Sequence, residues 1–135
     1  MARDASVRDF ARRLARVPVS IRAATNKAIA KNAEEWVRVS RATAPKDTED
    51  GTPLHDSIRR HTTESGGQVV RAGGPPTTKP SAGGQVDYAI SQEFGTAAMT
   101  ASPFFWPVYR SFKKRWATRR RSAMNKAFKE FNNGG

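Results

Sequence analysis

A helical repeat of apolar side chains between two prolines constrains the fold of this chain more than any other feature. Between Pro18 and Pro45, apolar and small side chains recur at steps of three and four residues, which is the spacing along one face of an α-helix. The stripe consists of Ile21, Thr25, Ala28, Asn32, Trp36 and Val39, widened by Ile29, Ala33 and Val37. Proline interrupts a helix, and the residue before a proline avoids the helical conformation. The pattern therefore predicts a long helix from about residue 19 to residue 44, preceded by a shorter one.

The shorter helix and the β region are predicted from local composition. Before Pro18, a short amphipathic helix would carry Val7, Phe10, Leu14 and Val17 on one face. Residues 45–72 begin with turn-forming residues and continue with two runs rich in β-branched residues, 57–65 and 68–73, separated by Gly66 and Gly67. Such runs, joined by a glycine pair, predict an antiparallel hairpin. We expect a turn followed by a β-hairpin.

The segment 73–84, GGPPTTKPSAGG, has four glycines and three prolines and little to bury. That composition predicts an exposed, mobile loop. Residues 85–101 would contain one short element, a helix or a strand, which Gly95 ends because glycine accepts a positive φ.

The last predicted element is a helix over 102–131. Ser102 would be its N-cap and Pro103 its first helical residue. An aromatic stripe of Phe105, Tyr109, Phe112 and Trp116 continues through Ala123, Met124, Ala127, Phe128 and Phe131. The ordinary role of such a stripe is core packing, here against the N-terminal helix. We predict one domain, residues 1–135, of the α+β class, with long N-terminal and C-terminal helices packed on a small antiparallel sheet.

Composition limits the classes of function. The 135 residues include no cysteine, which excludes disulfides and thiolate metal sites. No stretch has the roughly 20 apolar residues of a membrane-spanning helix, and the N-terminus lacks the apolar run of a secretory signal. We therefore expect a soluble, unexported protein with no membrane partner. The net charge of +12 would attract nucleic acid, an anionic membrane or an acidic protein, without deciding between them.

Candidate catalytic and metal-binding groups are few. His55 and His61 are six residues apart in a turn and a strand, a spacing that keeps the two imidazoles apart. Ser57 beside Asp56 and His55 supplies the residue types of a hydrolase triad, but neighbours on a strand point to opposite faces. Glu93 stands in an apolar context with no second acid or base nearby in the sequence. The sequence predicts no enzymatic activity, no metal site and no cofactor.

The basic residues gather in the segment RSFKKRWATRRRSAMNK, residues 110–126. They include Lys113, Lys114, Arg115, Arg119, Arg120 and Arg121, interleaved with Phe112 and Trp116. Cations could grip phosphates while aromatic rings stack on bases, which gives non-sequence-specific nucleic-acid binding as one hypothesis. A solvated basic helix face is the plainer interpretation.

Three motifs follow one another along the chain. A predicted helix closing on Ala-Pro is followed by a leucine and a Ser-Ile pair, then by Tyr-Ala with Glu-Phe-Gly-Thr, then by a Pro-Phe-Phe-Trp-Pro segment. The matching residues are Ala44, Pro45, Leu54, Ser57 and Ile58; Tyr88, Ala89, Glu93, Phe94, Gly95 and Thr96; and Pro103, Phe104, Phe105 and Pro107. This order resembles the head-to-tail joining, or tail completion, proteins of long-tailed bacteriophages, over about residues 20–115. The chain departs from that pattern by the extra Thr52 and Pro53 and by the long loop at 73–84.

The resemblance implies a structural virion protein of the phage neck without catalysis. Its copies would form a ring, hexameric to match a tail tube, between the portal-side connector or stopper and the tail tube proteins, with DNA passing through the lumen. Such a protein would act as a head–tail connector, tail completion or tail terminator protein. It would be located in the virion neck, and in the host cytoplasm during assembly. The basic residues would then face DNA or acidic partner proteins, and the sequence leaves both open.

The resemblance also implies roles for particular residues. Under it, Phe94, Phe104, Phe105 and Trp106 form a closing corner, some packing inward and some facing the next protomer. Glu93 would be a positioned anion paired with an arginine, and Gly95 would allow the chain reversal that brings back the last helix. The subunit-interface or structural set is Tyr88, Glu93, Phe94, Gly95, Thr96, Pro103, Phe104, Phe105, Trp106 and Pro107. The long loop would be an arm toward a neighbouring subunit, with Gly73, Pro75, Pro76, Lys79 and Pro80.

Overall fold

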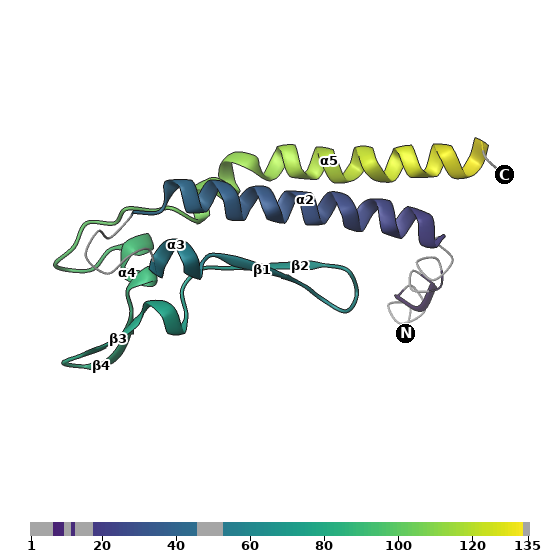
Figure 1. Cartoon of the computed structure of the whole chain (residues 1–135). Helices are drawn as coiled ribbons and strands as arrows, with labels where there is room; N and C mark the ends of the chain where they lie inside the picture. Colours follow the sequence, from purple (N-terminus) through teal and green to yellow (C-terminus); the bar gives the residue numbers. More distant parts are fainter. Residues whose placement is uncertain (1–6, 10–11, 13–17, 46–52, 134–135) are drawn as a thin grey trace.

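The computed structural model describes residues 7–9, 12, 18–45 and 53–133 of the chain (Figure 1). Most of the predicted first helix and the acidic part of the predicted turn, residues 46–52, lie outside these residues. The elements in chain order are α2 (Val19–Thr43), α3 (Pro53–Ser57), β1 (Arg59–Thr62), β2 (Gln68–Arg71), the 3₁₀ helix η1 (Pro75–Thr77), β3 (Thr78–Ser81), β4 (Gly84–Asp87), α4 (Tyr88–Phe94) and α5 (Trp106–Asn133).

The long helix α2 has the predicted ends. Pro18 has extended backbone angles, φ −56° and ψ 146°, and its carbonyl accepts the first helical hydrogen bonds, from the N–H groups of Ile21 and Arg22. At the other end Ala44 leaves the helical region with ψ 133°, as the following proline requires. The two prolines that flank the helical repeat in the sequence therefore set both ends of α2.

Helices α2 and α5 lie side by side and antiparallel along nearly their whole length (Figure 1). The Trp36 indole N–H donates to the carbonyl of Phe105 at 3.1 Å, near the start of α5. One turn earlier on α2, the Asn32 side chain donates to the carbonyl of Trp116 at 3.0 Å, further along α5. The predicted packing of the C-terminal aromatic stripe against the N-terminal helix is confirmed.

Trp36 is the centre of that packing. Its ring centroid lies 4.7 Å from that of Phe105, in a stacked arrangement, and 5.2 Å from that of Tyr109. The rings of Trp106 and Trp116 lie 5.8 and 5.7 Å away. Aromatic pairs at these distances contribute beyond their buried area. The stripe on α5 thus wraps around a single tryptophan of α2.

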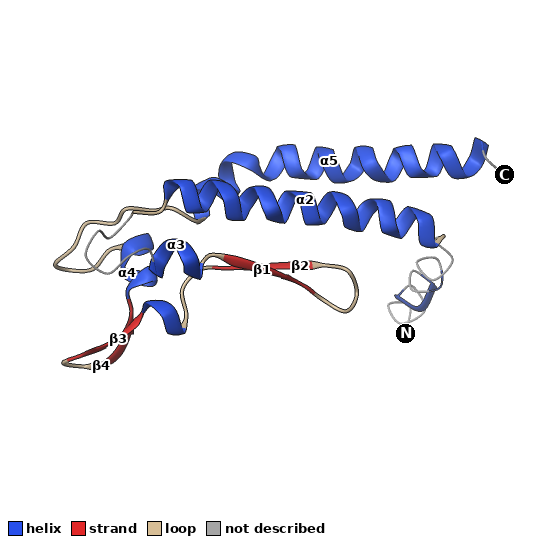
Figure 2. Ribbon diagram, in the orientation of Figure 1, coloured by secondary structure: helices blue, strands red, loops and turns tan. Residues whose placement is uncertain are grey.

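The strands form two separate two-stranded antiparallel sheets rather than one (Figure 2). In β1–β2 the register runs from Arg59 opposite Arg71 to Thr62 opposite Gln68, and the hairpin lies against α2. The predicted hairpin around the glycine pair is confirmed, with Gly66 at φ 90° in the turn. The second hairpin, β3–β4, projects away from the helices (Figure 2). The chain is thus α+β, with long helices packed on a small antiparallel β region, as predicted.

The main core cluster lies where α2 ends and α5 begins. Its buried members are Ala44, Leu54, Ile58, Ala89, Phe104 and Phe105. They come from four different segments of the chain, so this cluster joins the helices to the β region. Partly buried side chains pack around it, including Trp36, Val70 and Tyr88.

Three local predictions are wrong. The segment before β1 forms a short helix, α3, instead of a turn. Residues 73–84 form η1, strand β3 and the turn into β4 rather than a structureless loop. The last helix begins at Trp106, so Ser102 and Pro103 precede it instead of starting it. In the last case a distant side chain replaces the local cap, as described below.

Candidate functional site

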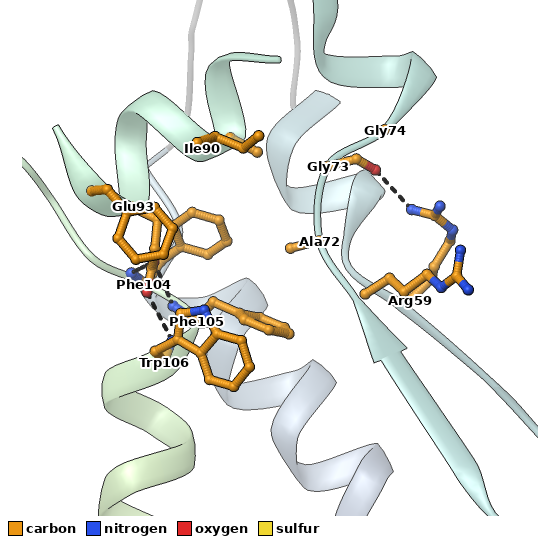
Figure 3. A pocket seen from close by; sticks show the side chains of 12 residues that line it. Arg59, Ala72, Gly73, Gly74, Ile90, Glu93, Phe104, Phe105 and Trp106 are labelled. Atoms are coloured by element: carbon orange, nitrogen blue, oxygen red, sulfur yellow. Dashed lines mark hydrogen bonds between the residues drawn. The ribbon is translucent and has the colours of Figure 1, made fainter. Parts of the chain in front are cut away.

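The Glu93 carboxylate caps the start of α5 from a different helix. Oε2 accepts hydrogen bonds from the N–H groups of Phe104 and Phe105 at 2.8 and 3.1 Å, and Oε1 accepts one from Trp106 at 2.9 Å (Figure 3). The first N–H groups of a helix have no partner within the helix and carry partial positive charge, so an anion is favourable there. The prediction that Glu93 has a partner is confirmed. Within the described residues its partners are backbone amides and none is an arginine, and an arginine from an adjoining subunit stays a prediction.

Helix α4 holds Glu93 in this position. Asp87 caps α4, accepting a hydrogen bond from the N–H of Ala89 at 3.0 Å, and Ala89 and Glu93 face the core on the buried side of this seven-residue helix. The N–H of Ser102 donates to the carbonyl of Gln92 at 2.8 Å, which ties the connecting loop to the end of α4. The cap is therefore fixed by backbone contacts on both sides.

Gly95 makes the chain reversal after α4, as predicted. Its φ of 77° and ψ of 174° lie in a region that essentially only glycine occupies. A Cβ here would lie 2.8 Å from the backbone nitrogen of Ala101 and 3.0 Å from the carbonyl oxygen of Met99. Thr96 begins the tight turn that follows, where its N–H donates to the Met99 carbonyl at 2.9 Å. The reversal returns the chain to α2, against which α5 then packs.

The predicted aromatic corner divides into buried and exposed members. Phe104 and Phe105 are 1% and 7% exposed, whereas Phe94 and Trp106 are 68% and 41% exposed. Ile90, one turn before Phe94 on α4, is 61% exposed. Sequence reasoning missed Ile90, although its spacing of four from Phe94 on a helix would have indicated it. Pro103 is exposed and Pro107 half-buried, on either side of the two buried rings.

A groove of about 410 Å³ lies beside this corner. Ile90, Glu93 and the residues Phe104, Phe105 and Trp106 form one side, and Ala72, Gly73 and Gly74 form the other (Figure 3). Arg59 lies at its edge, where the guanidinium donates to the carbonyls of Ser57 and Gly73 at 2.7 and 2.9 Å. The exposed apolar side chains and this groove form one continuous surface, which we call the apolar corner: Ile90, Phe94 and Trp106 with the groove beneath them.

The base of the β3–β4 hairpin is anchored by Asp87. Its carboxylate accepts from the N–H of Gly74 at 2.8 Å and from the Thr77 hydroxyl at 2.5 Å, in addition to the Ala89 N–H. Burial alone would raise the pKa of Asp87, but these hydrogen bonds outweigh it and hold the pKa below its ordinary value. Thr77 is fully buried. The segment predicted to be a mobile loop is therefore held at its base by hydrogen bonds to Asp87.

The residues predicted to form an arm are split between that anchor and the projecting strands. Gly73 is buried, and its N–H donates to the Ser57 hydroxyl at 2.9 Å. Pro75 and Pro76 are exposed in η1, and Lys79 and Pro80 are exposed in β3. The Lys79 amino group lies 5.4 Å from the centre of the half-buried Tyr88 ring, which places Tyr88 between the hairpin and the core.

The six predicted basic residues differ in their surroundings. Arg115 and Arg119 lie 3.8 and 3.6 Å from the Glu35 carboxylate, and Arg119 also donates to the Asn32 side chain at 2.9 Å. The other four, Lys113, Lys114, Arg120 and Arg121, are exposed, and none of them has a hydrogen bond or ion pair with another described residue.

Glu35 is a polar centre between α2 and α5 that sequence reasoning missed. The residue is 8% exposed and accepts a hydrogen bond from the indole N–H of Trp116 at 2.9 Å. Burial would raise its pKa, but the Trp116 hydrogen bond and the charges of Arg119 and Arg115 outweigh burial and lower the pKa. Glu35 follows Asn32 of the apolar stripe by three residues, and this helical spacing could have indicated that it lies on the buried face of α2.

This arrangement also corrects the nucleic-acid hypothesis in one respect. Trp116 is 7% exposed, its ring is stacked on Phe112 at 5.7 Å, and its N–H is bound to Glu35. Trp116 is therefore part of the helix–helix interface and has no free ring face for a base. The positive charge of α5 is available for phosphate contacts, but the aromatic ring of Trp116 is not available to stack on a base between them.

The residue types of a hydrolase triad are not arranged as one. Ser57 is buried, and its hydroxyl donates to the carbonyl of Leu54 at 2.6 Å while accepting from the Gly73 N–H. His55 contacts its neighbour Asp56 at 3.1 Å on the exposed side of α3. Among the described residues there is no group of three or more His, Cys, Asp and Glu side chains that could hold a metal ion.

Comparisons with other proteins give no match. No protein-family model matches the sequence, and neither the curated proteins nor the solved structures contain a significant match. Within the described residues, none of the helices combines the length and the hydropathy that crossing a bilayer requires.

Proposed function

We propose that the protein is a structural component of the neck of a long-tailed phage particle, where its copies form a ring that joins the DNA-filled head to the tail. The observation that carries the proposal is the meeting of the three sequence motifs at one place. The core cluster consists entirely of residues from these motifs, among them Ala44, Leu54, Ile58, Ala89 and Phe104. The Glu93 cap links the second motif to the third through three hydrogen bonds. The motifs are thus parts of one packed unit, which supports the resemblance on which the proposal rests.

The apolar corner supplies the surface that a ring subunit needs. Ile90, Phe94 and Trp106 are 61%, 68% and 41% exposed, and they surround a groove with an apolar floor. Contiguous exposed apolar surface on a protein of this size marks a contact site for another protein. In the proposed ring this corner is the seam between neighbouring copies, and it contacts a different surface on the next copy. Contacts of that head-to-tail type close into rings when the rotation permits.

The remaining parts of the proposal follow from the resemblance. The ring is a hexamer that matches the tail tube, its neighbours are the portal-side connector or stopper and the tail tube, and DNA passes through the lumen. The projecting β3–β4 hairpin reaches toward an adjacent subunit. Its anchored base supports this role, because the Asp87 hydrogen bonds fix the direction in which it projects.

Negative-stain imaging of particles made with and without this gene tests the proposal. We expect DNA-filled heads beside unattached tails when the gene is absent. Normally joined particles would reject the neck assignment.

The seam is tested by complementing the gene deletion with two matched variants. Phe94→Ser lies in the apolar corner, and Phe131→Ser removes the same side chain from an exposed site, 48% exposed, at the far end of α5. We expect Phe94→Ser to lower the yield of joined particles and Phe131→Ser to leave it near the wild-type level. Equal yields from the two variants would contradict the seam.

Non-sequence-specific nucleic-acid binding is the second candidate. It is favoured by exposed cations of α5 that have no hydrogen bond or ion pair with another described residue, among them Lys113, Lys114, Arg120 and Arg121. Phosphate contacts weaken steeply with salt, whereas an apolar seam persists at moderate salt. The oligomeric state of the isolated chain, measured together with its DNA binding as the salt concentration rises, therefore separates the two candidates.

A further inference from the structure

A second groove, of about 400 Å³, lies between α2, α5 and strand β2. It is distinct from the apolar corner and shares no lining residue with it. Trp36 and Ala33 of α2, Val70 of β2 and Ala117 of α5 contribute its apolar lining. The polar atoms of its tryptophans are already used, since Trp36 donates to the carbonyl of Phe105 and Trp116 donates to Glu35. The groove therefore offers apolar contact surface in which the two indole N–H groups are already satisfied.

Two cations line this groove, Lys113 and Arg120 of α5. They are seven residues apart, which places them on the same face of the helix and about 10 Å apart along its axis. Both are exposed, and neither has an ion pair or hydrogen bond with another described residue. No acidic residue lines the groove. An occupant that carries negative charge would neutralise both cations.

The aromatic packing favours a protein occupant over a nucleic acid. Trp36 is stacked on Phe105 at 4.7 Å, and Trp116 is stacked on Phe112 at 5.7 Å. Trp36 and Trp116 also contact each other, with centroids 5.7 Å apart. No gap between these rings is left for a base, and phosphates alone would leave the apolar lining unused. Side chains of an amphipathic helix use both features, because such a helix places apolar residues in the groove and acidic residues at its edge.

A second copy of this chain fits the groove poorly. Its long helices carry few acids to place opposite the two cations: Glu34 and the buried Glu35 in α2, and Glu130 in α5. We propose that this groove binds an amphipathic, acidic helical segment of a different protein, with apolar side chains against Trp36 and Val70 and carboxylates opposite Lys113 and Arg120. The inference rests on the proposed function for one point: the partner is then a protein of the adjoining layer of the neck. Complementary charge would steer and orient that docking.

The test uses a synthetic peptide as the probe. The peptide is an amphipathic helix with leucines along one face and glutamates spaced two turns apart beside them. A second peptide is identical except that glutamines replace the glutamates. Binding of each fluorescently labelled peptide to the full-length protein is measured by fluorescence anisotropy. We expect the glutamate peptide to bind about tenfold more tightly, since two charge contacts of ordinary surface strength together give about that ratio.

The chain provides a matched pair of variants. Lys113→Glu with Arg120→Glu reverses the two charges that line the groove. Lys114→Glu with Arg121→Glu reverses two exposed charges with the same spacing on the same helix, and neither residue lines the groove. We expect the first pair to weaken binding of the glutamate peptide at least about tenfold and the second pair to change it by less than about threefold. Circular dichroism confirms that both variants retain their helices.

Three results would overturn the inference. They are equal loss in the two charge-reversed variants, no preference for the glutamate peptide over the glutamine peptide, and displacement of the peptide by a short duplex DNA whose own binding requires Lys113 and Arg120. The last result would assign the groove to nucleic acid. Particle imaging with and without the gene scores the proposed function separately. Normally joined particles without the gene reject the neck assignment and leave the peptide result unchanged, whereas a peptide that does not bind rejects the groove and leaves the neck assignment unchanged.

Discussion

Replacing the buried Glu93 by alanine should destabilise the protein more than removing any exposed or half-buried acid. The carboxylate accepts three backbone hydrogen bonds, at 2.8, 3.1 and 2.9 Å, and the residue is 7% exposed. Alanine leaves the N–H groups of Phe104, Phe105 and Trp106 without a partner, and the first two are buried, so water does not readily replace the carboxylate. The start of α5 and the adjacent core would both be weakened.

The size of this effect can be bounded. Loss of an N-cap that satisfies one amide costs about 1 kcal/mol, and a hydrogen bond to a charged group contributes about 1.5 to 3 kcal/mol. Alanine leaves two buried amides unsatisfied, and each unsatisfied buried donor costs about 1 to 3 kcal/mol. We therefore expect Glu93→Ala to lower the free energy of unfolding by about 3 to 5 kcal/mol. Glu93→Gln keeps one carbonyl acceptor in place and should cost about half as much.

Urea unfolding followed by far-UV circular dichroism and tryptophan fluorescence measures the change. The control is Glu34→Ala, which removes an exposed carboxylate with a single 2.8 Å ion pair to Arg60. Such a pair contributes less than about 1 kcal/mol. The reasoning would be refuted if Glu93→Ala lost no more stability than Glu34→Ala, because the three amides would then find water or another partner at no cost.

Two further predictions concern backbone strain and acid stability. Gly95→Ala should lower the free energy of unfolding by about 2 to 3 kcal/mol, because alanine is strained at a φ of 77° and its Cβ would lie 2.8 Å from a backbone nitrogen. Gly83→Ala, whose Cβ would meet nothing within 4 Å, is the control, and equal thermal stability of the two variants would contradict the assignment. The pKa values of Asp87 and Glu35 are lowered in the folded protein, so both carboxylates stabilise it above their ordinary pKa values and lose this contribution as the pH falls below about 4. In Asp87→Asn the free energy of unfolding, measured by urea unfolding across that pH range, should therefore decline less steeply with acid. A replacement at the exposed Glu64 should leave this decline unchanged. If the decline in Asp87→Asn matched that of the wild type, the hydrogen bonds of Asp87 would not favour its charged form.

Local chemistry in the sequence was sufficient to predict several elements. Prolines and the helical repeat predicted the ends and the buried face of α2, since the restrictions that Pro18 and Pro45 place on the backbone act within one or two residues. The glycine pair predicted the β1–β2 turn for the same reason. The aromatic stripe on α5 predicted a buried face, although it did not identify Trp36 as the centre of the packing.

Contacts between distant segments decided the rest. The sequence predicted that α5 starts at Ser102, with Ser102 as its cap. It starts at Trp106 instead, because Glu93 on another helix caps it there. The segment 73–84 is ordered at its base because Asp87 and Ser57 accept hydrogen bonds from Gly74 and Gly73, which no local rule connects to them.

The same division holds for the candidate sites. The sequence by itself determined that the chain has a helical pair, a β-hairpin, a basic C-terminal tract and a concentration of apolar residues near Phe94, because these properties depend on composition and short-range spacing. Only the tertiary structure decided which of those residues are exposed and can contact a partner. Packing buries Phe104 and Trp116 and leaves Phe94, Lys113 and Arg120 exposed. Burial depends on which side chains of other elements pack against a residue, and the spacing of residues along one element does not specify those contacts.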